Sequence, residues 1–171
     1  MRVSIAARLA RRHLDDMNLE ELTALFRKLG AEDPEGWARS QHNEGIDQLA
    51  RFVFLREAWK FVVPPGDSSW IDNVIANAKM RPSDPGSRVG QALERLLALG
   101  ADRKDLHEVV RDMQHELLFS LCYLLDGPDE LEPELADLSW QLVRIDEDGE
   151  IVSTIDSLHE SVLETDPAGE W

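Results

Sequence analysis

Three of the five histidines in this 171-residue chain are followed directly by a glutamate. The three dipeptides are His107-Glu108, His115-Glu116 and His159-Glu160. In a zincin, a second histidine four residues after the first lets both imidazoles bind zinc from one helix face, with the glutamate as general base. The corresponding positions in this chain hold Arg111, Phe119 and Leu163. The pattern therefore predicts no metal site, and no cofactor-binding motif accompanies it.

Two histidines also lie three residues after an aspartate, as Asp112 to His115 and Asp156 to His159. This spacing places both groups on one helix face, where a carboxylate can fix the tautomer of an imidazole or share a metal with it. A site needs three or four converging groups, and spacing alone does not show convergence. The simpler interpretation is a solvated, ion-paired helix surface. The candidate catalytic residues of an enzyme hypothesis are His107, Asp112, His115, His159 and Glu160.

The single cysteine, Cys122, lies among Leu121, Tyr123, Leu124 and Leu125. A cysteine nucleophile needs a stabilised thiolate that substrate can reach. These neighbours favour neither, so Cys122 is predicted to be a structural thiol. One cysteine also cannot form an internal disulfide, which excludes a disulfide-stabilised secreted scaffold.

Acidic residues greatly outnumber basic ones, and they concentrate toward the C-terminus. The chain has 34 Asp and Glu against 18 Lys and Arg, a net charge of -16. Residues 86–171 hold 21 acidic and 6 basic side chains, whereas residues 1–85 are almost balanced. Nucleic-acid binding takes its affinity from Lys and Arg that neutralise phosphates, so nucleic acid is excluded as a partner. The charge favours a basic protein partner, and the carboxylates from Asp129 to Asp137 are expected to face it.

The C-terminal string Leu158–Gly169 reads LHESVLETDPAG and follows the acidic turn Asp146–Gly149. This ending resembles that of an uncharacterised family of small acidic bacterial proteins, in which a hairpin with a DEDG-like turn leads to an LHESVL-x-TDP-x-G tail. The resemblance covers about the last 35 residues. The chain departs from the family pattern at Ala168, where a threonine is more usual, and lacks an arginine after the glycine. The resemblance implies a bacterial cytoplasmic setting and assigns no catalytic residue.

Apolar residues at helical spacing, bounded by capping residues, glycines and prolines, predict about six helices. In chain order, the predicted helices span residues 1–14, 18–30, 46–63, 68–80, 88–100 and 102–125. Residues 31–45 form either a short helix or a loop. The clearest boundaries are Asn18, which forms a capping box with Glu21, and Gly30, which supplies a left-handed C-terminal residue. Residues 46–63 are apolar on most sides, which is typical of a buried helix.

The last long helix changes character along its length. Its first turns alternate apolar and charged residues, whereas residues 117–125 are apolar except for Ser120, Cys122 and Tyr123. This second half is predicted to cross the core. Leucines left at the surface would instead mark a dimer interface.

The segment after residue 127 is predicted to fold back on the helices. Apolar and polar residues alternate on both sides of the turn Asp146–Gly149, which predicts a β-hairpin. Asp156 is expected to cap a short helix that docks Leu158, Val162 and Leu163.

Together these patterns predict a mainly α (α+β) fold, a helical bundle-like single domain of about six helices with a C-terminal β-hairpin. Residues 1–127 are assigned to the helical core, and residues 128–171 to an acidic hairpin and tail packed on it. No run of about 18 apolar residues offers a membrane span, so a cytoplasmic protein without a membrane partner is predicted.

The favoured function is a non-catalytic intracellular interaction protein of the immunity, antitoxin or regulatory-adaptor type. It would bind a basic protein partner, and the oligomeric state is left open between a monomer and a homodimer. The alternative is a small enzyme, with or without a metal, that uses the histidines and carboxylates named above.

Overall fold

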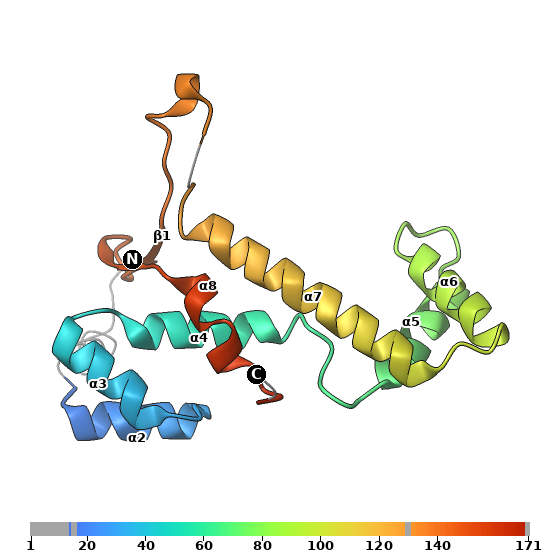
Figure 1. Cartoon of the computed structure of the whole chain (residues 1–171), viewed down its shortest axis with the longest axis horizontal. Helices are drawn as coiled ribbons and strands as arrows, with labels where there is room; N and C mark the ends of the chain where they lie inside the picture. The colour runs from blue at the N-terminus through green and yellow to red at the C-terminus, as the bar shows by residue number, and fades with distance from the viewer. Residues whose placement is uncertain (1–13, 15–16, 129–130, 170–171) are drawn as a thin grey trace.

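Seven α-helices and one two-stranded antiparallel sheet make up the described part of the chain (Figure 1). The computed structural model describes residues 14, 17–128 and 131–169. The helix predicted for residues 1–14 therefore lies almost wholly outside the described residues. The helices are α2 (Leu19–Leu29), α3 (Pro34–Glu44), α4 (Gln48–Trp59), α5 (Ser69–Met80), α6 (Ser87–Ala98), α7 (Arg103–Leu125) and α8 (Leu158–Ser161). The strands are β1 (Leu142–Ile145) and β2 (Ile151–Ile155), and two 3-10 turns are η1 (Pro133–Leu135) and η2 (Leu163–Thr165). The prediction of a mainly helical domain with a C-terminal hairpin is confirmed.

Local capping explains where the first described helices begin and end. The capping box of Asn18 and Glu21 is present, and Gly30 ends α2 with a φ of 92°. For residues 31–45 the sequence favours neither a short helix nor a loop. In the structure this stretch contains α3, which forms because Asp33 caps the helix and Pro34 opens its first turn.

Helix α4 is shorter than the sequence predicts, since it ends at Trp59 rather than at Val63. Lys60 forms its C-cap, and Phe61 just beyond is 85% exposed. The apolar run thus continues to Val63, beyond the C-terminal end of α4. Residues 64 and 65 are both proline, which cannot donate a backbone N–H and which disfavours the helical conformation at the residue before it.

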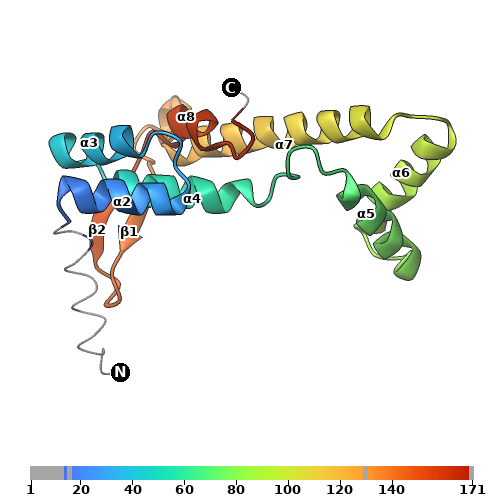
Figure 2. The same ribbon diagram turned by 90° about the horizontal axis from the view of Figure 1, so that it is seen from below.

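The helices gather in two groups at the two ends of the long helix α7 (Figure 1). Helices α2, α3 and α4 lie with the hairpin and α8 near the C-terminal half of α7, while α5 and α6 pair near its N-terminal end (Figure 2). Helix α8 packs on α7 and α4, and β2 and η2 also contact α4. The segment after residue 140 thus packs on the helices, whereas residues 131–139 project beyond the end of α7 (Figure 1).

Two clusters of buried side chains form the core at this end. Helix α4 contributes to both, through Phe52 in one cluster and through Leu55 and Trp59 in the other. The first cluster joins α4 to α2 and α3 through stacked and edge-to-face contacts of Phe26, Trp37 and Phe52. The second joins α4 to α7 and the C-terminal segment, with members Leu55, Trp59, Val62, Cys122, Leu158 and Val162. Within residues 46–63, which are predicted to be buried, the part that forms α4 contributes Phe52, Leu55 and Trp59 to the buried clusters.

The prediction that residues 117–125 cross the interior is wrong for most of these residues. Cys122 is 1% exposed and Leu118 and Leu125 pack partly against the core, but Leu117 is 59% and Leu121 is 47% exposed. The physical reason is that α7 packs on one side only, chiefly against α8. A helix covered on one side buries about every third or fourth residue, whatever the polarity of the others.

Candidate functional site

The histidines proposed for an enzyme site lie in three separate environments. His107 is 5% exposed, and its Nδ1 accepts a hydrogen bond of 3.0 Å from the indole N–H of Trp70. His115 stacks on Trp59 with ring centroids 5.8 Å apart and planes 6° apart. His159 pairs through Nδ1 with Asp126 at 2.5 Å. Each imidazole thus has its own aromatic or carboxylate neighbour from a different element.

The carboxylate candidates do not complete such a site. Asp112 is exposed on α7, and Glu160 is exposed on α8. The described residues contain no group of three or more histidine, cysteine, aspartate or glutamate side chains arranged to hold a metal ion. Arg111, which stands where a zincin would have its second histidine, instead forms an ion pair with Asp166.

Asp126 explains the position of His159. Its carboxylate accepts hydrogen bonds from the backbone N–H groups of Leu158 and His159, at 2.8 and 3.1 Å, as well as contacting the imidazole. Asp126 therefore caps α8 from the end of α7, and the prediction that Asp156 is the cap is wrong. Asp156 is bonded to Arg51 instead. The cap holds Ser157 in a left-handed conformation, with a φ of 52°.

The C-terminal string serves largely to fasten the chain end to α4 and α7. Leu158 and Val162 are fully buried, and Asp166 is 4% exposed. Asp166 pairs with Arg111, whose guanidinium carbon lies 5.4 Å from the centroid of the Trp59 ring. The indole N–H of Trp59 donates to the backbone carbonyl of Val162 at 3.1 Å. These contacts give the tail residues a structural role.

Cys122 has the properties of a structural thiol, as predicted. It is buried in the second core cluster. Burial, followed by the nearby charge of Asp126, raises the pKa of Cys122 to about 11. A thiol with a raised pKa carries little thiolate at neutral pH, and the thiolate is the nucleophilic form.

A polar cleft with a volume of about 760 Å³ lies between α3 and the C-terminal segment. We name it the α3–α8 cleft. Four exposed carboxylates line it, contributed by Glu32 and Asp33 before α3 and by Glu160 and Glu164 of the C-terminal segment. No ion pair joins any of the four to another described residue. The lining thus carries four acidic side chains against one basic one, Arg51, which pairs with Asp156, so its charge is predominantly negative.

Helix α4 forms the inner wall of the cleft through two buried polar side chains. Gln48 is 6% exposed, donates to Ser40 Oγ at 2.8 Å, and leaves its Oε1 without a hydrogen-bond partner among the described residues. Arg51 is also 6% exposed and donates to Asp156 at 3.1 Å. Trp37, which is 8% exposed, lies on the same wall. A buried polar atom without a partner is costly, and the Nε of Arg51 on this wall also lacks one among the described residues.

Sequence reasoning found one of the four cleft carboxylates. Glu160 belongs to the His159-Glu160 pair of the sequence. In the structure it lines the cleft, whereas His159 pairs with Asp126. Glu32, Asp33 and Glu164 were missed because they come from segments far apart in the chain. The only available signal was the general excess of acidic residues.

Comparison with protein-family models, curated proteins and solved structures finds no match to this chain. The resemblance of the C-terminal string to a bacterial family therefore stays a prediction. None of the described helices is long and apolar enough to cross a membrane.

Proposed function

We propose that this chain is a non-catalytic interaction protein that binds a basic segment of a protein partner in the α3–α8 cleft. The observation that carries the proposal is the set of four carboxylates that line the α3–α8 cleft without an ion pair to another described residue. A lysine or arginine side chain entering the cleft would meet this negative charge. An acidic surface of this kind also speeds association with a cationic partner.

The aromatic part of the wall can add packing to the negative charge of the rim. Trp37 supplies an aromatic edge of the wall, next to which the aliphatic stem of a lysine or arginine can pack. The proposal includes the cytoplasmic setting expected from the sequence, with an immunity, antitoxin or regulatory-adaptor role.

The enzyme alternative has less support. It needs His107, His115 and His159 to act on one substrate together with a carboxylate. The three imidazoles contact Trp70, Trp59 and Asp126 respectively, on different elements. The cavity that His107 lines has neither His115 nor His159 in its lining.

The test is capture of a basic protein from an extract of the native cell at 50 and 500 mM salt. Binding should weaken steeply with salt because exposed charges are screened over about 8 Å at physiological ionic strength. The double variant Glu160→Gln/Glu164→Gln should capture at least tenfold less of the same protein at low salt.

The matched control is Glu44→Gln/Glu116→Gln, which removes the same charge from exposed residues that do not line the cleft. It should retain most of the binding. Equal loss in both double variants would show a diffuse charge effect and would overturn the assignment of the cleft. Capture that is unchanged at 500 mM salt would overturn the electrostatic basis of the proposal.

A further inference from the structure

A stripe of exposed apolar side chains runs along the side of α7 that faces away from α8. Its members are Val109, Met113, Leu117, Leu121 and Leu124, which are 57%, 68%, 59%, 47% and 51% exposed. At 1.5 Å per residue the stripe is about 22 Å long. Soluble monomers rarely expose so many large apolar side chains on one continuous face. We name it the α7 stripe.

Two other exposed apolar groups lie beyond the ends of the α7 stripe. At the N-terminal end, α6 exposes Val89, Leu96 and Leu99, which are 55%, 42% and 85% exposed. At the C-terminal end, residues 131–141, here named the acidic arm, expose Leu135 at 45% and Leu138 at 54%. Figure 1 shows α6 and the acidic arm rising from opposite ends of α7, on the side away from α4. The arm is attached at its base, where the indole N–H of Trp140 donates to the carbonyl of Leu124.

We propose that a second copy of this chain occupies the α7 stripe, in an antiparallel dimer with a twofold axis beside Leu117. This register places Met113 opposite Leu121 of the second copy. Val109 then lies near Leu124 of the second copy, and the reverse pairs follow from the twofold symmetry. The N-terminal end of each α7 meets the C-terminal end of the other. Each acidic arm is thereby brought to the α5–α6 pair of the other copy.

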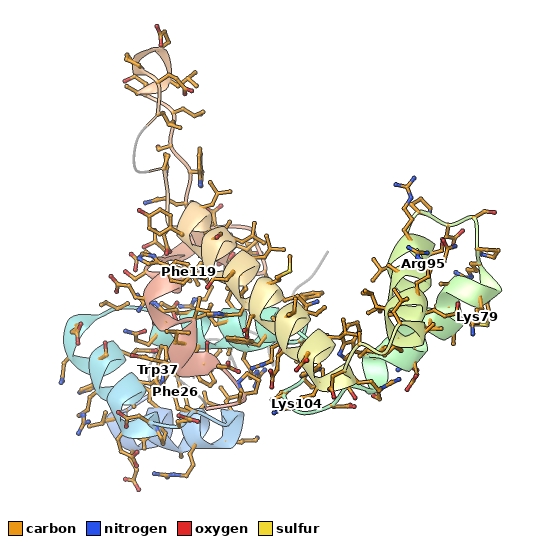
Figure 3. The ribbon with its side chains drawn as sticks, turned by 45° about the vertical axis from the view of Figure 1, so that its right-hand side comes forward. Phe26, Trp37, Lys79, Arg95, Lys104 and Phe119 are labelled. Atoms are coloured by element: carbon orange, nitrogen blue, oxygen red, sulfur yellow. The ribbon has the colours of Figure 1, made fainter. Side chains whose placement is uncertain are left out.

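The charges at the two ends are complementary in this arrangement. The acidic arm carries Glu132, Glu134 and Asp137, all exposed and with no basic residue among them. The α5–α6 pair exposes three arginines, Arg81, Arg88 and Arg95, for which no ion pair to another described residue is found. Figure 3 shows Arg95 and Lys79 at the end of the molecule opposite the acidic arm. An antiparallel dimer brings unlike charges together at both ends, whereas a parallel dimer would place arm against arm.

The apolar area is sufficient for a stable dimer. A valine, leucine or methionine that is about half exposed leaves on the order of 100 Å² to bury. The ten side chains of the α7 stripe, α6 and the acidic arm therefore offer roughly 1,000 Å² on each copy. Two copies would bury about 2,000 Å², which reaches the size of stable protein interfaces.

The first test is the molar mass in solution, measured by sedimentation equilibrium. The native chain should have twice its own mass of 19.4 kDa. Leu117→Glu should give a monomer with unchanged helix content, because the side chain is exposed and contributes little to the core. The matched control is Ile151→Glu, at a residue 69% exposed on the hairpin, which should remain dimeric. A native monomer at micromolar concentration, or a dimer that persists in Leu117→Glu, would overturn the proposal.

The register is tested by cysteine cross-linking in a Cys122→Ser background with oxidised glutathione. Leu117→Cys should form a covalent dimer by itself, because the twofold axis brings it close to its own copy. Met113→Cys and Leu121→Cys should cross-link to each other when mixed and far less when alone. Cross-linking of Met113→Cys with itself, as strong as that of Leu117→Cys, would indicate a parallel pair and would contradict the antiparallel register.

The contact between acidic arm and α6 is tested by charge reversal. Glu134→Arg and Arg95→Glu should each raise the dissociation constant of the dimer, by about three- to tenfold. The double variant should restore it toward the native value, since the two changes together exchange the signs. If the double variant dimerises more weakly than either single variant, Glu134 and Arg95 of the two copies do not face each other. Sedimentation also separates this proposal from the proposed function, because loss of the dimer leaves the carboxylates of the α3–α8 cleft intact.

Discussion

Replacing Asp166 by asparagine should strongly destabilise the protein. The Asp166 carboxylate is 1% exposed and forms an ion pair with Arg111, whose side chain is 10% exposed. Asparagine keeps an oxygen for the hydrogen bond from the backbone N–H of Ala168, so the change removes mainly the charge. Breaking a buried pair by removing one partner leaves an uncompensated charge and costs about 3–5 kcal/mol. For a chain of this length, each kcal/mol lowers the melting temperature by about 2–4 °C.

The expected result is therefore a fall of roughly 6–20 °C in the melting temperature at pH 7, followed by circular dichroism at 222 nm. Glu164→Gln is the control, since this carboxylate is exposed and only two residues away. Arg111→Met/Asp166→Asn should be more stable than Asp166→Asn alone, because no buried charge remains. A melting temperature within 2 °C of the native value would refute the view that this pair fastens the C-terminal segment.

Three further predictions concern α6, the thiol and metals. Gly90→Ala should lower the free energy of unfolding, measured in urea, by about 1–3 kcal/mol. The reason is that an added Cβ would lie 2.5 Å from the Val74 carbonyl oxygen and 2.6 Å from Ala78 Cβ. An unchanged unfolding midpoint would refute this close crossing of α5 and α6. Cys122 should react with a thiol reagent at pH 8 only after denaturation, and stability should fall as the pH rises from 9 toward 11, since the unfolded thiol then ionises while the folded one, with its pKa raised to about 11, does not. Rapid labelling of Cys122 in the native protein would contradict the prediction that this thiol reacts only after denaturation. A chelator should leave the melting temperature unchanged, because the described residues hold no group of three metal ligands, and one equivalent of zinc or iron in the purified protein would contradict it.

Local sequence signals predicted the elements well where a short stretch of chain determines the structure. The capping box at Asn18 and the left-handed Gly30 fix the ends of α2 through contacts within a few residues. The turn at Asp146–Gly149 likewise fixes the hairpin, in which Leu142 pairs with Ile155. Helix α7 begins and ends within one residue of its predicted limits.

Features that depend on long-range packing were not predictable in the same way. An apolar run shows that a segment is apolar, but not which of its sides is covered, so residues 117–125 were placed in the core while Leu121 is 47% exposed. The partner of His159 is Asp126, which is 33 positions away, and not the neighbouring Asp156 or Glu160. The α3–α8 cleft combines carboxylates from segments more than 120 residues apart, which only the folded chain brings together.

The proposed interaction function is tested most directly by an NMR titration of the isotope-labelled protein with a lysine-rich peptide. The indole N–H of Trp37 and the side-chain amide of Gln48 lie on the wall of the α3–α8 cleft and report on its occupation. We predict that both signals shift in proportion to peptide added at 50 mM salt, and that the shifts disappear at 500 mM salt and in Glu160→Gln/Glu164→Gln. Shifts confined to the acidic arm, or shifts at Trp37 and Gln48 that survive in the double variant, would contradict the assignment of this cleft as the binding site.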